Sequence, residues 1–400
     1  MYACEKYFNE FLLLSFRSFK KIIVTGISIA ACNVIEFLKS KRLKNIYIYD
    51  ELFSFNDHIK KFKGVNVINE ELTASIDYFF IFTEFSSNKQ NELILKLKPR
   101  NYLVIRSCDE VRIEASGLCN LKCMSCQCGN YDPAVFDFKG RGFMSPGLCE
   151  QIIDKLCREY STNTGVFYYI FGEPFLNQEL HKLVRIAKNK GLSVILSSNF
   201  SFDMPIDNVL DAKPDIIKVS VSGYSDDVYK RHHNGGSIER VHKNMEHLYH
   251  YLDNNPADTA VVVGYHIYSD NDGNEISKTK QLCEKYGFIF APVKAIYNNP
   301  LKRMGLSAFT DRDMEFLKSC YHNYESYLAF DTSDYYINSK CRNTDNKLFI
   351  DYDGNVMLCE LLHKDGIFKN YLECSMEEIY DWRKMHYICR QCRSHGLMLL

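Results

Sequence analysis

The stretch GLCNLKCMSC, residues 117–126, decides the fold, because it places three cysteines at C-x3-C-x2-C spacing directly after a strand-like run. They are Cys119, Cys123 and Cys126. Zinc sites typically use paired C-x2-C units that close a tetrahedron, whereas this run offers three thiolates without an equally close fourth. Three thiolates can hold a [4Fe-4S] cluster and leave one iron open to a ligand. Cys128 could be a fourth ligand, but a single residue separates it from Cys126.

Composition excludes several classes of protein. Among 400 residues, 49 are basic and 50 acidic, so no net charge favours nucleic acid or an anionic membrane as a partner. Sixteen cysteines are too few for a disulfide scaffold, and their grouping at two places indicates metal or cluster ligation. The sequence contains no run of eighteen apolar residues, so we expect no membrane-spanning helix and a cytoplasmic location.

The amino-terminal part, residues 1–108, is expected to be a small Rossmann-like α/β domain. KKIIVTGISIAAC (20–32) resembles a lipoprotein-type signal, but polar residues interrupt its apolar run, so a buried strand fits better. A helix is expected over 27–39, and strands over 21–26, 45–50, 65–68, 76–83 and 102–107. A dinucleotide site needs a glycine-rich first turn, and only Gly26 is present, although Asp50 has the position of a ribose-binding acid. The alternative is a structural or partner-docking module.

A second and longer series of strands and helices, residues 109–320, predicts a parallel six-stranded partial barrel. Its strands are expected over 111–115, 166–171, 193–197, 216–221, 260–267 and 289–294. Helix starts are indicated at Ser145-Pro146, Asn177 and Asn274, and helix ends at Gly191 and Gly287. Ligands bind at the carboxyl ends of such strands, and the three cysteines follow the first strand.

RIEASGLCNLKCMSC (112–126) resembles the core of the radical S-adenosylmethionine (SAM) enzymes, and the resemblance covers about residues 111–300. It implies that the three cysteines hold a [4Fe-4S] cluster whose fourth iron is chelated by SAM. FGEPFLN (171–177) resembles the family's Gly-Gly-Glu-Pro turn, with Phe171 in place of the first glycine. Later strand ends, LSSN (196–199) and VSVSG (219–223), resemble segments that line SAM. The implied SAM contacts are Gly172, Glu173, Pro174, Ser198, Asn199 and Ser220.

A second group of thiols lies in the carboxyl-terminal part, residues 321–400. It consists of Cys341, Cys359, Cys389 and Cys392, and Asp353-Gly354 is expected to form a hairpin tip before Cys359. Ser375 and Glu378 form a capping box for a helix over 375–386. The spacing resembles the twitch domain, a shortened SPASM domain, which implies one auxiliary [4Fe-4S] cluster. A structural zinc site is the alternative.

The resemblance implies reductive cleavage of SAM to a 5'-deoxyadenosyl radical that abstracts hydrogen from a C–H bond, with electrons from a flavodoxin- or ferredoxin-type donor. An auxiliary cluster could accept the next electron, which favours dehydrogenation of a small polar or sugar-like substrate. Alternatives are a peptide substrate, a redox-neutral epimerisation, and a non-enzymatic zinc-binding adaptor.

The catalytic side chain is not identified by the sequence. Cys128, Cys320 and Cys374 are candidate hydrogen-atom donors or ligands, while Cys149, Cys157 and Cys283 are expected in the core. His232 and His233 are neighbours on a helix, so they should point apart and serve as surface or substrate contacts.

Overall fold

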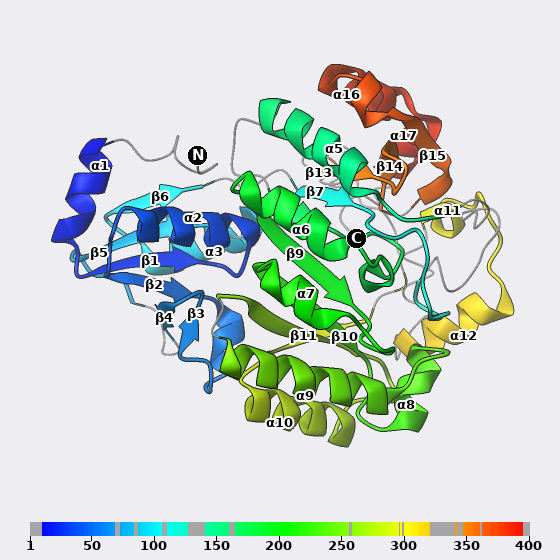
Figure 1. Ribbon diagram of the computed structural model, residues 1–400, viewed down its shortest axis with the longest axis horizontal. Coiled ribbons are helices and arrows are strands. Elements are labelled where there is room, and N and C mark those ends of the chain that lie inside the picture. Colours follow the sequence, from blue (N-terminus) through cyan, green and yellow to red (C-terminus); the bar gives the residue numbers. More distant parts are fainter. Residues whose placement is uncertain are drawn as a thin grey trace.

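The computed structural model describes residues 10–68, 73–83, 87–105, 110–126, 141–159, 165–255, 258–295, 297, 300–320, 341, 347–360 and 362–394. Two sheets organise them, one of six strands and one of nine (Figure 1). The first described helix is α1 (Glu10–Ser15), followed by the 3-10 turn η2 (Phe16–Ser18). Candidate donor Cys128 lies outside the described residues.

The six-stranded sheet has the order β3-β4-β2-β1-β5-β6, and it is parallel except where β3 meets β4. Its strands are β1 (Lys21–Thr25), β2 (Ile46–Tyr49), β3 (Lys61–Phe62), β4 (Val65–Val67), β5 (Tyr78–Phe82) and β6 (Tyr102–Val104). Helices α2 (Ile29–Ser40) and α3 (Ser87–Leu97) and the 3-10 turn η3 (Glu51–Phe55) connect them. The predicted α/β alternation is therefore present.

Both carboxylate oxygens of Asp50, the predicted ribose-binding acid, accept hydrogen bonds from backbone amides. Its Oδ1 accepts from the Leu52 amide at 2.8 Å, and its Oδ2 accepts from the Ile27 amide at 2.9 Å. Ser28 caps α2 by accepting from the Ala31 amide. These contacts give Asp50 a structural role at the first turn.

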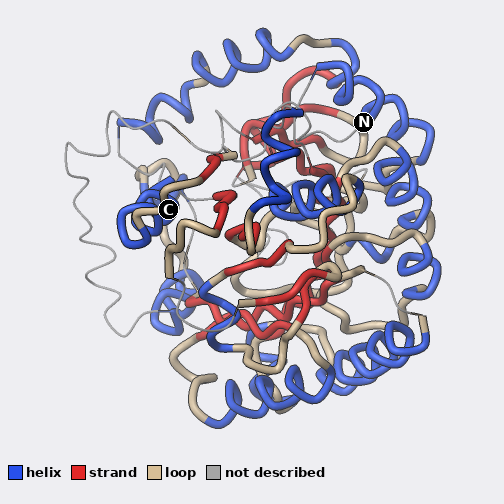
Figure 2. The backbone as a smooth tube through the Cα atoms, turned by 90° about the vertical axis from the view of Figure 1, so that its left-hand side faces the viewer, coloured by secondary structure: helices blue, strands red, loops and turns tan. Residues whose placement is uncertain are grey.

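The nine-stranded sheet contains the six parallel strands of the partial barrel in chain order. They are β7 (Glu110–Ile113), β8 (Gly165–Phe167), β9 (Ser193–Ser198), β10 (Ile216–Val221), β11 (Ala260–Ile267) and β12 (Ile289–Lys294). The outer helices are α5 (Pro146–Glu159), α6 (Leu180–Asn189), α7 (Ile206–Asp211), α8 (Asp226–His232), α9 (Ile238–Asn254) and α10 (Asn274–Tyr286). Figure 2 shows helices around the outside of the strands. Strand β8 is shorter than predicted: the Tyr168 amide still bonds to the Ile195 carbonyl of β9, and the chain then reaches the cysteine loop, where the Glu173 amide bonds to the Leu118 carbonyl.

The predicted helix signals agree with the structure except at Asn177. Ser145 accepts from the Leu148 amide at the start of α5, and Gly287 ends α10 in the left-handed conformation at φ 68°. Helix α6 begins at Leu180, so the prediction that Asn177 caps it is wrong. Its Oδ1 accepts from the Glu179 amide before the helix, and its buried Nδ2 donates to the carbonyls of Ala115 and Met144, all at 2.9 Å. Asn177 thus fastens the segment after β8 to the end of β7.

The carboxyl-terminal hairpin extends the barrel sheet. Strand β13 (Lys347–Ile350) pairs in parallel with β7, and β14 (Asn355–Cys359) and β15 (Leu362–Asn370) follow antiparallel. The Asp353-Gly354 tip forms as predicted, with Gly354 at φ 86°. After the 3-10 turn η5 (Tyr371–Glu373), the predicted capping box opens α16 (Met376–Met385), and α17 (Tyr387–Ser394) follows. Helices α11 (Pro300–Arg303) and α12 (Asp311–Cys320) precede the hairpin.

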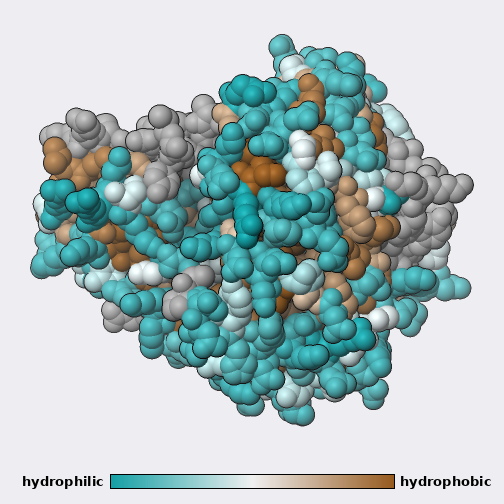
Figure 3. Space-filling view, viewed as in Figure 1, coloured by the Kyte–Doolittle hydropathy of each residue, from teal (hydrophilic) through white to brown (hydrophobic). Residues whose placement is uncertain are grey.

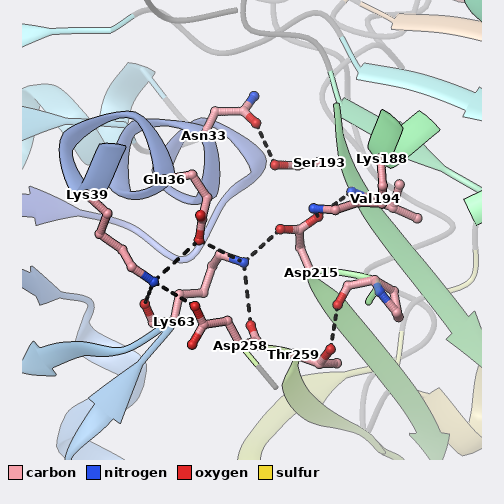
Figure 4. A network of polar contacts seen from close by, with 11 residues as sticks. Asn33, Glu36, Lys39, Lys63, Lys188, Ser193, Val194, Asp215, Asp258 and Thr259 are labelled. Carbon is pink, nitrogen blue, oxygen red and sulfur yellow. Dashed lines mark hydrogen bonds and ion pairs between the residues drawn. The ribbon is translucent and has the colours of Figure 1, made fainter. Parts of the chain in front are cut away.

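The amino-terminal domain closes the end of the barrel at which the strands begin. Inward-facing barrel residues share one apolar core with β1, α2 and η3, namely Phe167, Ile195, Ile216, Val262 and Ile289. The polar seam in Figure 4 joins the same parts: Lys63 Nζ lies 2.7 Å from Asp215 Oδ1, and Lys188 Nζ lies 2.6 Å from Asp215 Oδ2. The side chains of Lys63 and Asp215 are 3% and 1% exposed, so this ion pair is buried.

The face drawn in Figure 3 is mainly hydrophilic, with scattered apolar patches. No helix in the described part of the chain is long and apolar enough to cross a membrane.

Candidate functional site

The cysteine loop leaves the carboxyl end of β7 and holds its three thiols half-buried. Apolar side chains of Phe171, Phe349 and Met357 pack against Cys119 and Cys126. Burial raises the pKa of the Cys119 thiol to about 12, and the charges of Glu173 and Cys126 add to the effect. Burial followed by the neighbouring thiols also raises the pKa of Cys123. The three thiols therefore interact electrostatically in a poorly solvated environment.

This donor set fits a multi-iron cluster. Thiolates in an apolar setting are costly unless a cation neutralises them, and metal binding removes the protons that burial otherwise retains. Among the described residues, no group of three or more His, Cys, Asp or Glu side chains is placed to hold a single metal ion. A cubane distributes its thiolates over separate irons, so its ligand sulfurs need not converge on one point.

The turn after β8 lies against this loop so closely that only glycine fits at position 172. A Cβ on Gly172 would stand 1.8 Å from the Ser116 carbonyl oxygen and 2.8 Å from that of Leu118. The next residue, Glu173, donates its amide to the Leu118 carbonyl at 2.8 Å. The side chain of Phe171, which replaces a glycine of the family motif, is buried against the apolar cluster around Cys119. The Gly-Glu-Pro turn therefore fixes the start of the cysteine loop.

Glu173 is buried and ties the turn to the end of β9. Its Oε1 accepts from the Phe175 amide at 3.2 Å and its Oε2 from the Asn199 amide at 2.9 Å. Burial raises the pKa of this carboxyl to about 7, even though these hydrogen bonds oppose the shift. Pro174 opens the 3-10 turn η4 (Pro174–Leu176).

The other predicted SAM contacts occupy different places. Asn199 donates from Nδ2 to Asn120 Oδ1 at 2.9 Å, so it touches the cysteine loop. Ser198 is buried, and its Oγ accepts from the Phe200 amide. Ser220 lies on the inner face of β10, with its Oγ 3.5 Å from Ser197 Oγ. Asn199 thus lies at the mouth of the barrel and Ser220 in its interior. Ser198 instead bonds to the backbone that follows β9.

Sequence reasoning missed Glu114, which holds the Gly172 turn from behind. Its Oε1 accepts from the Phe171 and Gly172 amides at 3.3 Å each, and Arg141 Nη2 lies 2.6 Å from its Oε2. Burial outweighs Arg141 and raises the pKa of Glu114 to about 7. The Arg141 guanidinium lies over the ring of Tyr352, so the contacts continue to the carboxyl-terminal hairpin. A carboxyl directly after strand β7 was the available signal.

The segment His232–Gly236 also borders the cysteine loop. The Lys122 amide donates to the Asn234 carbonyl at 2.8 Å. His232 and His233 were predicted as surface or substrate contacts; they are 3% and 7% exposed, so the surface alternative is wrong and the substrate contact stays a prediction. They do point apart: His232 bonds to Asp270 Oδ1 at 2.8 Å, and the His233 ring faces Ser222 and Cys123. The close packing of the turn that follows α8 explains their burial.

Three of the four carboxyl-terminal cysteines predicted as ligands share one apolar cluster. Cys359, Cys389 and Cys392 pack with residues of α11, β14, α16 and α17 and with Met304, which follows α11; the helix and strand residues are Leu301, Leu358, Trp382 and Ile388. Cys341 is half-buried. Cys359 also belongs to the apolar cluster that contains Cys119 and Cys126. Phe349, Met357 and Cys359 therefore connect the two groups of thiols.

The remaining described cysteines divide by position. Cys320 is half-buried and packs on the cluster of Tyr268 and Phe316, which also contacts Met124 of the cysteine loop. Cys374 is buried, with Sγ 3.8 Å from the Tyr371 carbonyl. Cys149 and Cys283 lie in the core as predicted, but Cys157 is exposed, because it occupies the outer face of the amphipathic helix α5.

Below the thiols, the barrel interior is polar. Arg112 on β7 lies over the rings of Phe167 and Tyr169 at 5.3 and 5.6 Å, and it pairs with Glu360 at 2.6 Å. Lys218 on β10 lies 6.0 Å above the Phe167 ring. The inner faces of β7, β8 and β10 thus offer cations, aromatic rings and hydroxyl groups between the apolar base and the thiols.

Comparison with known proteins gives a family match for the central segment. Residues 113–279 match the model of the Radical SAM superfamily. No curated protein matches the sequence.

Three solved structures resemble the fold. Streptococcus suis SuiB bound to precursor peptide SuiA aligns at TM-score 0.47 and 14% identity, over 78% of this chain and 74% of that chain. BtrN in complex with AdoMet and 2-DOIA aligns at TM-score 0.41 and 14% identity, over 72% and 88%. Native anSMEcpe with bound AdoMet aligns at TM-score 0.45 and 16% identity, over 72% and 88%.

Proposed function

We propose that this chain, which carries a radical SAM domain in residues 113–279, is a radical SAM enzyme that oxidises a small polar or sugar-like substrate. One observation carries the proposal: the cysteine loop at the mouth of the parallel strands is held by a Gly-Glu-Pro turn into which no larger residue fits at Gly172. The three thiols of the cysteine loop meet there with Gly172, whose close packing against Ser116 and Leu118 we call the glycine cradle, and with the buried carboxyl of Glu173. The two segments are some fifty residues apart in sequence.

Cys119, Cys123 and Cys126 would hold a [4Fe-4S] cluster, and SAM would lie against the Gly172–Pro174 turn, Asn199 and Ser220. When bound, these groups supply reductive cleavage of SAM and a 5'-deoxyadenosyl radical that removes a hydrogen atom from a substrate carbon. The chain orients these groups and excludes water, because its apolar base and packed outer helices leave the strand ends as the open side. The initiating electron would come from a flavodoxin- or ferredoxin-type partner in the cytoplasm.

Cys341, Cys359, Cys389 and Cys392 would hold an auxiliary [4Fe-4S] cluster in a twitch-like carboxyl-terminal region. Cys359 packs both with Cys389 and Cys392 and in the apolar cluster of Cys119 and Cys126, which supports acceptance of an electron from the substrate at this place. Removal of a hydrogen atom and then an electron and a proton is a two-electron oxidation, so this pairing favours dehydrogenation over redox-neutral epimerisation.

The barrel interior supports a polar substrate of limited size. Arg112, Lys218 and Ser220 line its inner face, and the amino-terminal domain blocks the opposite end. Because that domain lies away from the thiols, it gives no support to a nucleotide-linked substrate. A peptide whose side chain enters the barrel is the alternative occupant.

Metal analysis tests the cluster assignment. Anaerobically reconstituted protein should contain about eight irons and eight sulfides per chain, and Cys389→Ala should retain about four of each. About four irons with one zinc in the wild type would replace the auxiliary cluster by a zinc site. Protein without iron would refute the enzyme and favour a zinc-binding adaptor.

An uncoupling experiment tests the oxidation. With deuterated small polar candidates, wild-type protein should transfer deuterium to 5'-deoxyadenosine and release oxidised product, whereas folded Cys389→Ala should transfer deuterium and release little product. Solvent hydrogen at an inverted carbon would indicate epimerisation instead. Deuterium transfer from labelled peptides alone would identify a peptide substrate.

A further inference from the structure

The His233 side chain lies between the cysteine loop and β10. Its Nδ1 is 3.7 Å from Cys123 Sγ, and its Nε2 is 2.9 Å from Ser222 Oγ. The ring is stacked on that of Tyr229, with centroids 4.6 Å apart and an interplanar angle of 8°. Both ring nitrogens therefore have a defined neighbour, and the stacking fixes the direction in which each points.

These neighbours select one tautomer of a neutral imidazole. A neutral imidazole has one N–H donor and one acceptor nitrogen, and a metal-bound thiolate has no proton, so its sulfur can only accept. The Ser222 hydroxyl can donate to Nε2, which leaves the ring proton on Nδ1, facing the sulfur.

The backbone holds this pair in register. The Lys122 amide, one residue before Cys123, donates to the carbonyl of Asn234, one residue after His233, at 2.8 Å. Gly236 packs so closely that a Cβ there would lie 2.7 Å from the Tyr229 ring. The imidazole and the loop sulfur are thus positioned by the same turn.

We infer that His233 donates a hydrogen bond to the Cys123 sulfur and thereby raises the reduction potential of the cluster held by the cysteine loop. This inference rests on the proposed function. A reduced cluster carries one more negative charge, part of it on the ligand sulfurs, so an N–H donor stabilises the reduced form more than the oxidised form. His233 is a positioning and tuning residue that makes the initiating electron transfer more favourable.

The test compares two substitutions at position 233. His233→Leu removes the donor, whereas His233→Asn retains an amide N–H near the place of Nδ1. His232→Leu is the matched control, because His232 is an equally buried neighbour that bonds to Asp270. The readout is the midpoint potential of the reconstituted protein, followed by electron paramagnetic resonance; the signal that changes on SAM addition identifies the loop cluster.

We expect the one-electron reduction equilibrium of His233→Leu to be about tenfold less favourable, a decrease of about 59 mV. His233→Asn should recover most of this shift, and His232→Leu should show little of it. If His233→Leu does not fold, Ser222→Ala gives a second measurement: it removes the hydroxyl that can donate to Nε2, which weakens the preference for the ring proton on Nδ1, and it should lower the potential in the same direction by less.

Two results overturn the inference. The first is an unchanged potential in His233→Leu, or in Ser222→Ala where that variant is used, with iron content equal to that of the wild type. The second is a shift in His233→Asn and His232→Leu as large as that in His233→Leu. In either case wild-type SAM cleavage would leave the proposed function intact. Wild-type protein that binds no iron would instead overturn both.

Discussion

Replacing Gly172 by alanine perturbs the contact on which the site is built. The new Cβ would lie 1.8 Å from the Ser116 carbonyl oxygen, 2.7 Å from the Ser116 carbonyl carbon and 2.8 Å from the Leu118 oxygen. Real Cβ contacts are essentially never shorter than 3.0 Å, so the two segments must separate by at least the difference between 1.8 and 3.0 Å. All three obstructing atoms belong to the backbone, which cannot rotate away as a side chain would.

The cost follows from packing and from one hydrogen bond. Overpacking a well-packed site costs about 1–3 kcal/mol, and separation of the segments weakens the bond from the Glu173 amide to the Leu118 carbonyl, worth about 1 kcal/mol. We therefore expect the unfolding free energy of Gly172→Ala to fall by about 2–4 kcal/mol. A displacement of roughly 1 Å in a positioning contact lowers rates by about 100-fold, so we expect SAM cleavage to fall by that order.

Denaturation by guanidinium measures the first effect on apo-protein, and 5'-deoxyadenosine formation measures the second on reconstituted protein. Gly147→Ala is the matched control, because a Cβ at that position of α5 meets nothing within 4 Å. It should be neutral or stabilise by about 0.5–1 kcal/mol. Equal stability and equal SAM cleavage in Gly172→Ala and Gly147→Ala would refute the proposed role of the glycine cradle.

Three further predictions test other parts of the structure. Lys63→Met should lower the unfolding free energy by about 3–5 kcal/mol, because it leaves Asp215 buried with one cation fewer. Lys39 is more exposed, so Lys39→Met should lower it by only about 0–1 kcal/mol. If denaturant titrations gave similar losses of unfolding free energy for the two variants, the seam would not be buried. Burial raises the pKa of Glu173 from 4.5 to about 7, so the folded protein binds its proton more tightly and wild-type stability should fall as pH rises between these values. Glu173→Gln should remove that part of the slope, and an unchanged slope would contradict the shift. Ser375→Ala removes half of the capping box of α16 and should cost about 1 kcal/mol by thermal denaturation, whereas no loss would show that the cap contributes little.

The α/β architecture was predictable because apolar runs and helix-ending glycines are local signals. Strands over 216–221, 260–267 and 289–294 are observed with the predicted bounds. The pairing of β13 with β7 was not predictable, since it joins segments more than 200 residues apart and depends on which sheet edge is available. Asn177 shows the same limit: its Oδ1 accepts from the Glu179 amide in a turn that precedes α6, and its Nδ2 donates to two carbonyls of distant segments, contacts that its sequence position does not reveal.

At the candidate site, the spacing of cysteines and of the Gly-Glu-Pro residues along the chain identified the residues that belong to short local motifs. The cysteine loop and the Gly-Glu-Pro turn are short motifs, so their residues could be named from sequence. Glu114 and His233 meet these motifs only through tertiary contacts, and their own neighbours in sequence carry little trace of that role.

Formation of 5'-deoxyadenosine under dithionite tests the central claim most directly. Reconstituted wild-type protein should cleave SAM, and so should Cys157→Ala, which changes an exposed thiol outside the loop. The triple substitution of Cys119, Cys123 and Cys126 by alanine should reduce the product to the level of a protein-free control. Cleavage by the triple variant at the wild-type rate, or no cleavage by iron-loaded wild type, would contradict a radical SAM site at this loop.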